Sequence, residues 1–70
     1  MIKRYTTTWF RRYDFKTILN NHIWQMNIEL LNFRTIKGWL FNEYHISLKG
    51  KKEDLEIAKL ALNLEEVANG

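Results

Sequence analysis

A helical repeat of apolar residues runs through the C-terminal third of the chain and defines one element of the fold. Between Glu53 and Ala68, apolar side chains recur every three or four residues, which is the spacing of one face of an α-helix. These residues are Ile57, Leu60, Ala61, Leu64, Val67 and Ala68. Glu53 and Asp54 fall in the first turn, where negative charge complements the helix dipole. The pattern predicts a helix over residues 52–68.

A second apolar stripe, formed by Leu55, Ala58 and Leu62, lies beside the first on this helix. Together the two stripes cover roughly two thirds of the circumference, whereas a helix lying on a sheet needs an apolar face of only about 100°. We therefore expect the N-terminal segment, a second copy of the chain or a partner protein to cover the second stripe. Leu55, Ala58 and Leu62 are the candidate interface residues.

Upstream of the helix, apolar and polar residues alternate, which is typical of half-buried strands. Residues 23–30 and 44–49 follow this pattern, and Trp24 shares the apolar side of the first of them, so we expect it in the core. Residues 35–41 are rich in β-branched and aromatic side chains, and Asn42-Glu43 is the expected turn into the next strand. Residues 5–10 have strand propensity as well.

Residues 14–33 also fit a helical face, which would give the order β-α-β-β-α; its members are Phe15, Ile18, Leu19, Ile23, Met26, Leu30 and Phe33. Poor helix formers such as Thr17 and Asn20, together with the unbroken alternation from Trp24 to Leu30, favour a strand instead. The prediction is an α+β fold in one small domain spanning residues 1–70. A small antiparallel sheet of three to four strands, over about residues 3–49, would carry one C-terminal helix packed on one face.

The residues needed for catalysis or metal binding are scarce. The chain has no cysteine and a single serine, and its two histidines, His22 and His45, are far apart without further ligands at a suitable spacing. We therefore expect no enzyme activity, no cofactor and no metal site. No apolar stretch is long enough to span a membrane, and no apolar region follows the N-terminal charges as in a secretory signal. The expected location is the cytoplasm.

Charge is distributed unevenly along the chain. Residues 1–52 contain ten Lys and Arg and three Asp and Glu, a net charge of +7. Residues 53–70 contain one Lys and five Asp and Glu, a net charge of −4. A sheet whose open face presents cations and aromatic rings would bind phosphates and stack on bases. We therefore expect a small protein that binds DNA or RNA. The candidate residues are Trp9, Arg11, Arg12, Lys37, Trp39, Lys49, Lys51 and Lys52.

The segment from Ile46 to Glu53, with the helix after it, resembles the end of a double-stranded RNA-binding domain. In that family a last strand leads into a helix whose first lysines touch phosphates, so the resemblance implies this role for Lys51 and Lys52. The alanine-rich helix of that family is missing here. The order of sheet and helix is similar also to the arm-binding domains of phage integrases and to plant AP2-type domains, which place a three-stranded sheet in the DNA major groove.

The alternative is a small protein-binding inhibitor or adaptor of the kind that phages and mobile elements carry. Aromatic residues make up 14% of the chain, more than one small core needs, and aromatic anchors dominate protein interfaces. In this interpretation exposed aromatics and the second helix stripe bind a partner protein or a second copy of the chain.

Overall fold

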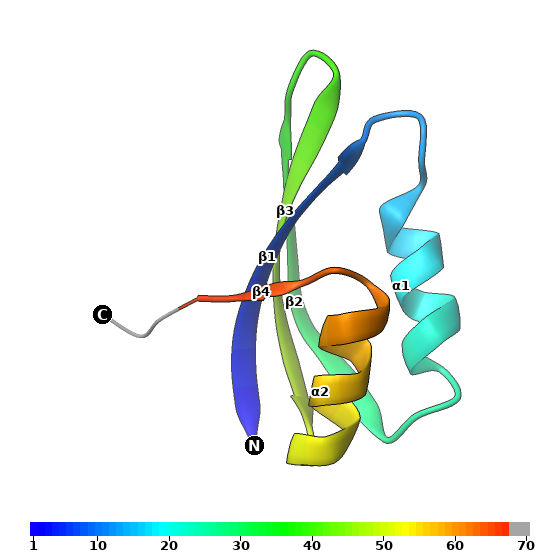
Figure 1. Ribbon diagram of the computed structural model, residues 1–70, viewed down its shortest axis with the longest axis vertical. Helices are drawn as coiled ribbons and strands as arrows, with labels where there is room; N and C mark the ends of the chain where they lie inside the picture. The colour runs from blue at the N-terminus through cyan, green and yellow to red at the C-terminus, as the bar shows by residue number, and fades with distance from the viewer. Residues whose placement is uncertain (68–70) are drawn as a thin grey trace.

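The computed structural model describes residues 1–67 and has six elements in the order β-α-β-β-α-β. They are β1 (Ile2–Phe10), α1 (Phe15–Ile23), β2 (Ile28–Lys37), β3 (Phe41–Gly50), α2 (Lys52–Ala61) and β4 (Glu65–Glu66). Both helices lie on the same side of the sheet, and the β2–β3 hairpin extends beyond the rest of the chain at the top of Figure 1.

The four strands form one antiparallel sheet in the order β2-β3-β1-β4. β3 is central and pairs with β1 along its whole length, from Ile2 opposite Lys49 to Phe10 opposite Phe41. This element order and strand order are those of the split β-α-β, or ferredoxin-like, topology. The α+β class and the antiparallel sheet are confirmed, but two helices cover the sheet where one was expected.

The additional helix is α1, which lies within the segment that was expected to form a strand. Asp14 caps its first turn, because the carboxylate accepts hydrogen bonds from the backbone N–H of Thr17 at 3.3 Å and from its hydroxyl at 2.8 Å. These bonds lower the pKa of Asp14. Phe15, Leu19 and Ile23 follow at intervals of four residues and are buried against the sheet. The helical alternative for residues 14–33 was therefore right up to Ile23.

Trp24 ends α1 and does not belong to the core, because 82% of its surface is exposed. β2 begins only at Ile28, so the strand predicted from residue 23 was wrong in its first half. A bulge between Leu30 and Asn32 then shifts the register of β2 by one residue, which brings Phe33 to the helix-covered face. The apolar alternation therefore does not continue through this strand.

The β2–β3 turn lies at residues 38–40 and not at Asn42-Glu43, which belong to β3. Gly38 explains this position, because a Cβ atom there would collide with the carbonyl oxygen of Phe41. The Gly38 N–H donates a hydrogen bond to the Asn42 side chain at 3.3 Å. Asn42 therefore stabilises the turn from its place in the strand.

Helix α2 packs on the sheet with the second apolar stripe, for which the N-terminal segment, a second copy of the chain or a partner protein was the expected cover. Leu55, Ala58 and Leu62 are almost fully buried against the sheet, so these three candidate interface residues belong to the core. Ile57 and Leu60, from the stripe expected in the core, are exposed instead. The prediction had the existence of the helix right and its orientation wrong.

Helix α2 is also shorter than predicted, because it ends at Ala61. Asn63 has a φ of 54°, and the Leu64 N–H donates to the Lys59 carbonyl at 2.9 Å, as in a Schellman motif. The buried Thr7 hydroxyl donates to the Asn63 carbonyl at 3.0 Å. The chain then enters β4, and Ala68, the predicted end of the helix, lies outside the described residues.

The core lies between the two helices and the covered face of the sheet. Its centre is an aromatic stack in which the Phe15 ring lies 4.6 Å from Tyr44 and 6.2 Å from Phe33, measured between ring centroids. Strand β4 is held to β1 by a 3.0 Å ion pair between Lys3 Nζ and Glu66, which raises the pKa of Lys3. The opposite face of the sheet carries no helix within residues 1–67.

Candidate nucleic-acid interface

The strand register determines which side chains share the open face of the sheet. Residues directly opposite one another in an antiparallel pair point to the same side, and alternate residues of a strand share a face. Tyr5, Thr7, Tyr44 and Ile46 are buried beneath the helices, so their neighbours along each strand lie on the open face. From β1 and β3 these are Ile2, Arg4, Thr6, Thr8, Phe10, Phe41, Glu43, His45, Ser47 and Lys49.

Exposed aromatic rings and arginines gather at the end of the sheet formed by the β2–β3 turn and the β1–α1 loop. We call this set the hairpin-end patch; its members are Phe10, Arg11, Arg12, Tyr13, Trp39 and Phe41. The Phe10 and Phe41 rings stack with centroids 4.5 Å apart. Trp39 is 85% exposed, and among the ring pairs within residues 1–67 none includes it. The indole is therefore free to stack on another ring.

Both arginines of this patch are held in place. Arg11 donates from Nη1 to the Trp39 carbonyl at 3.2 Å and from its backbone N–H to the Leu40 carbonyl at 3.0 Å. The Arg12 guanidinium lies 5.5 Å from the Phe10 ring centroid and 5.0 Å from that of Tyr13. Neither arginine forms an ion pair within residues 1–67, so their charges are available to an anion.

The predicted nucleic-acid-binding residues divide into three groups in the structure. Arg11, Arg12 and Trp39 come together in the hairpin-end patch, and Lys37 ends β2 beside it. Lys49, Lys51 and Lys52 lie at the other end of the sheet, where β3 leads into α2. Trp9 lies on the helix-covered face, with its ring 5.3 Å from Phe15 and 5.9 Å from Tyr13, so it serves the core.

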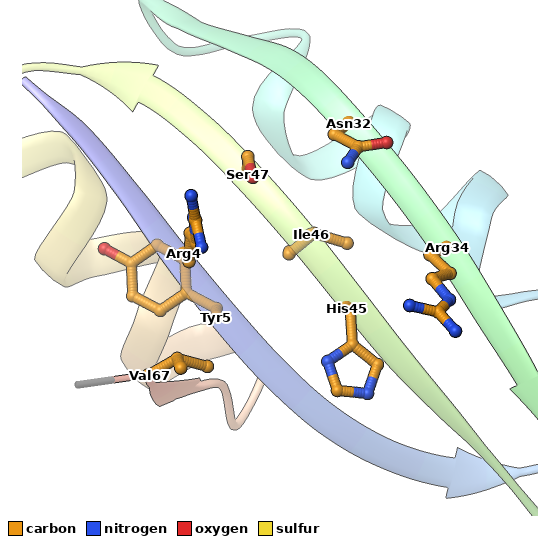
Figure 2. A pocket seen from close by; sticks show the side chains of 8 residues that line it. All are labelled: Arg4, Tyr5, Asn32, Arg34, His45, Ile46, Ser47 and Val67. Carbon is orange, nitrogen blue, oxygen red and sulfur yellow. The ribbon is translucent and has the colours of Figure 1, made fainter. Parts of the chain in front are cut away.

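A second cluster, on the open face, was missed in the choice of candidate residues. A shallow hollow of about 400 Å³ lies there. Figure 2 shows side chains that line it: Arg4 from β1, Asn32 and Arg34 from β2, and His45 and Ser47 from β3. The register explains the cluster, because Ser47 is opposite both Arg4 and Asn32, and His45 is opposite Arg34. The charge pattern of the sequence does not show that these residues are neighbours. Their proximity depends on the register of the three strands, which includes the bulge in β2.

The serine and the histidine beside the hollow are not joined by the hydrogen bond that activates a nucleophile. Within residues 1–67 no hydrogen bond joins Ser47 to His45, and the nearest carboxylate to the imidazole is that of Glu43, 3.2 Å from Nε2. That contact is not a hydrogen bond, so Nε2 has no hydrogen-bonding partner within the described part of the chain. Tyr5 lies beneath the hollow, and burial raises the pKa of its hydroxyl.

A third surface lies on the helix side. A groove of about 570 Å³ runs between α1 and α2. Its lining combines apolar Ile18, Met26, Ile57 and Leu62 with polar Asn21, His22 and Gln25. Leu60, on the outer side of α2, is 78% exposed. This surface is distinct from the hairpin-end patch and carries few cations.

Over residues 1–67 no helix has the length and apolar character needed to cross a membrane. In the same part of the chain, no three His, Asp or Glu side chains lie close enough to hold a metal ion. No protein-family model matches the sequence, and a search of the curated proteins found no significant match.

Proposed function

We propose that this protein is a small non-enzymatic nucleic-acid-binding protein that uses the hairpin-end patch to bind an unpaired strand. The observation that carries the proposal is the Trp39 indole, which is 85% exposed and has Arg11 fixed to its own carbonyl oxygen. Base stacking on an exposed aromatic ring tolerates any sequence, because every base has a π-face.

The two arginines suit the phosphates on either side of a stacked base. A guanidinium binds a phosphate through parallel hydrogen bonds, and Arg11 and Arg12 are already positioned by the Trp39 carbonyl and by two aromatic rings. Side chains that are ordered before binding lose less conformational entropy on binding. Stacking on Trp39 requires a base that is not paired and stacked in a duplex, so the preferred ligand is single-stranded.

The proposal is tested by fluorescence anisotropy with a labelled single strand and with the matching duplex, at low and high salt. The double variant Arg11→Gln/Arg12→Gln should weaken binding of the single strand and reduce its salt dependence. The matched control is Lys51→Gln/Lys52→Gln, which removes the same charge at the opposite end of the sheet. Equal losses in both variants would show that net charge, and not the patch, governs binding. Binding of neither strand nor duplex at low salt would refute the proposal.

A second candidate function is binding of a protein through the α1–α2 groove. It is favoured by the exposed Ile57 in that groove and by the exposed Trp24 and Leu60 at the end of α1 and on α2, since large exposed apolar patches mark interaction sites. The partner is another protein or a second copy of this chain. Sedimentation velocity over a range of concentrations, with Leu60→Glu as the comparison, tests the homodimer.

A further inference from the structure

Five side chains that can donate hydrogen bonds surround the hollow on the open face, and they come from three strands: Arg4, Asn32, Arg34, His45 and Ser47. Arg4 lies on β1 and Arg34 on β2, on either side of the central strand β3, with Ser47 on β3 and Asn32 on β2 between them. In Figure 2 the Arg34 guanidinium extends from β2 toward β3, and Arg4 lies alongside Ser47. An anion seated in the hollow would meet two guanidinium groups, an amide and a hydroxyl.

The charges of the two arginines are not neutralised within the described part of the chain. No ion pair joins Arg4 or Arg34 to a carboxylate there. Among the acidic side chains of the open face, Glu43 faces His45 and Glu29 is opposite Lys49, while Glu65 is opposite Thr6 and forms no ion pair with Arg4 within residues 1–67. A backbone phosphate suits this set, because its two non-bridging oxygens can accept charge-assisted hydrogen bonds from both guanidinium groups.

The hollow and the hairpin-end patch lie on one continuous surface. Arg4 and Phe10 are both on the open face of β1, and six residues of extended strand place them about 20 Å apart. Between them the face presents the small hydroxyl side chains of Thr6 and Thr8. A strand that leaves Trp39 can therefore cross this face without meeting a bulky side chain from β1.

We infer that the hollow lined by Arg4, Asn32, Arg34 and Ser47 binds a backbone phosphate of the same single strand whose base stacks on Trp39. The inference rests on the proposed function and adds a second contact point, so that affinity depends on the length of the strand. A short strand reaches only the hairpin-end patch, and a longer one engages both.

The test compares wild-type protein with the double variant Arg4→Gln/Arg34→Gln on oligothymidylates from about four to about sixteen nucleotides, the range of site sizes of small single-strand-binding folds. For long strands the variant should bind about tenfold or more weakly, as expected for one lost charge-assisted hydrogen bond. The slope of log K against log salt should fall by about 0.7, since the hollow holds one phosphate and each phosphate contact of a single strand contributes about 0.7. For the shortest strands the two proteins should bind alike.

The matched control is Lys16→Gln/Lys52→Gln, which removes the same charge from the two helices. A length-independent loss, or a loss equal to that of the control, would overturn the inference. So would unchanged binding of long strands, and in that case a loss in Arg11→Gln/Arg12→Gln would still support the proposed function. If wild-type protein binds no strand at all, the proposed function itself fails.

Nuclear magnetic resonance of the wild-type protein provides a measurement that needs no substitution. A long strand should shift the backbone amide signals of Asn32 and Ser47, and a short strand should shift only signals of the hairpin end. Unshifted Asn32 and Ser47 signals at saturation with the long strand would overturn the inference.

Discussion

Replacing Trp39 with alanine should separate binding from stability. Because 85% of the Trp39 surface is exposed, its removal should change the free energy of unfolding by no more than about 0.5 kcal/mol. The hydrogen bond from Arg11 is accepted by the Trp39 carbonyl, which alanine retains. The hairpin end should therefore keep its structure in the variant.

The loss in binding should be much larger than the loss in stability. Base stacking on an aromatic side chain contributes about 1–3 kcal/mol per base, which corresponds to a roughly 5- to 150-fold weaker affinity for Trp39→Ala. Trp39→Phe should recover part of this loss, because the smaller ring still stacks. Anisotropy titration of a labelled single strand measures the affinity, and urea unfolding measures the stability.

Trp24 provides the control, since it is a tryptophan of nearly equal exposure, 82%, at the C-terminal end of α1. Trp24→Ala removes the same side chain from a surface away from the hairpin end and should leave the affinity unchanged. If Trp39→Ala binds as tightly as wild type, or if Trp24→Ala loses as much affinity, stacking at the hairpin end is not the basis of binding.

Three further predictions concern the fold. Leu55→Ala should lower the free energy of unfolding by about 2–5 kcal/mol in urea, since Leu55 is buried, whereas Leu60→Ala on the exposed side of α2 should change it by less than about 0.5 kcal/mol. Asn63 has a positive φ of 54°, which alanine adopts poorly and glycine adopts freely. Asn63→Ala should therefore lower the free energy of unfolding in urea by about 1 kcal/mol, and Asn63→Gly should leave it unchanged. The hydrogen bonds from Thr17 lower the pKa of Asp14 in the folded state, so their stabilisation is present above the unfolded pKa of about 4 and is lost as pH falls through the folded value. The stability difference between wild type and Asp14→Asn should therefore vanish in acid, as thermal unfolding against pH can show.

The sequence was sufficient to predict α2, because an apolar repeat with acidic residues in its first turn has no good strand alternative. It was not sufficient to orient the helix. Both stripes are apolar, and the contacts with the sheet decide that Leu55 and Ala58 are buried while Leu60 is exposed. The length of the helix depended on Asn63, which adopts the left-handed conformation and ends the helix before the apolar repeat does.

The error at α1 came from giving more weight to alternation than to capping. The alternation from Trp24 to Leu30 is regular, yet its first residues form a turn and only its end belongs to β2. Asp14, three residues before Thr17, was the sign of a helix start that propensities alone did not reveal. The bulge after Leu30 could not be predicted from the apolar pattern, because it becomes evident only when β2 is paired with β3.

For the candidate site, the residue types could be chosen from the sequence but their positions could not. Arg11 and Trp39 are 28 residues apart, and they meet because the β1–α1 loop and the β2–β3 turn lie at the same end of the sheet. Lys51 and Lys52 are close to the sheet in sequence but lie at its other end. Arg4 and Arg34 face the same hollow only through the register of three strands.

The placement of charges also limits how a nucleic acid would bind. The net +7 of residues 1–52 does not form one basic face, because Arg4, Arg34 and Lys49 share the open face with Glu29, Glu43 and Glu65. Affinity must then come from local contacts. Three phosphate contacts, two by Arg11 and Arg12 and one shared by Arg4 and Arg34, would give a salt slope of about −2.1 for a single strand. A markedly steeper slope would mean that the lysines at the far end of the sheet also contact the strand, and the binding path would then run the full length of β3.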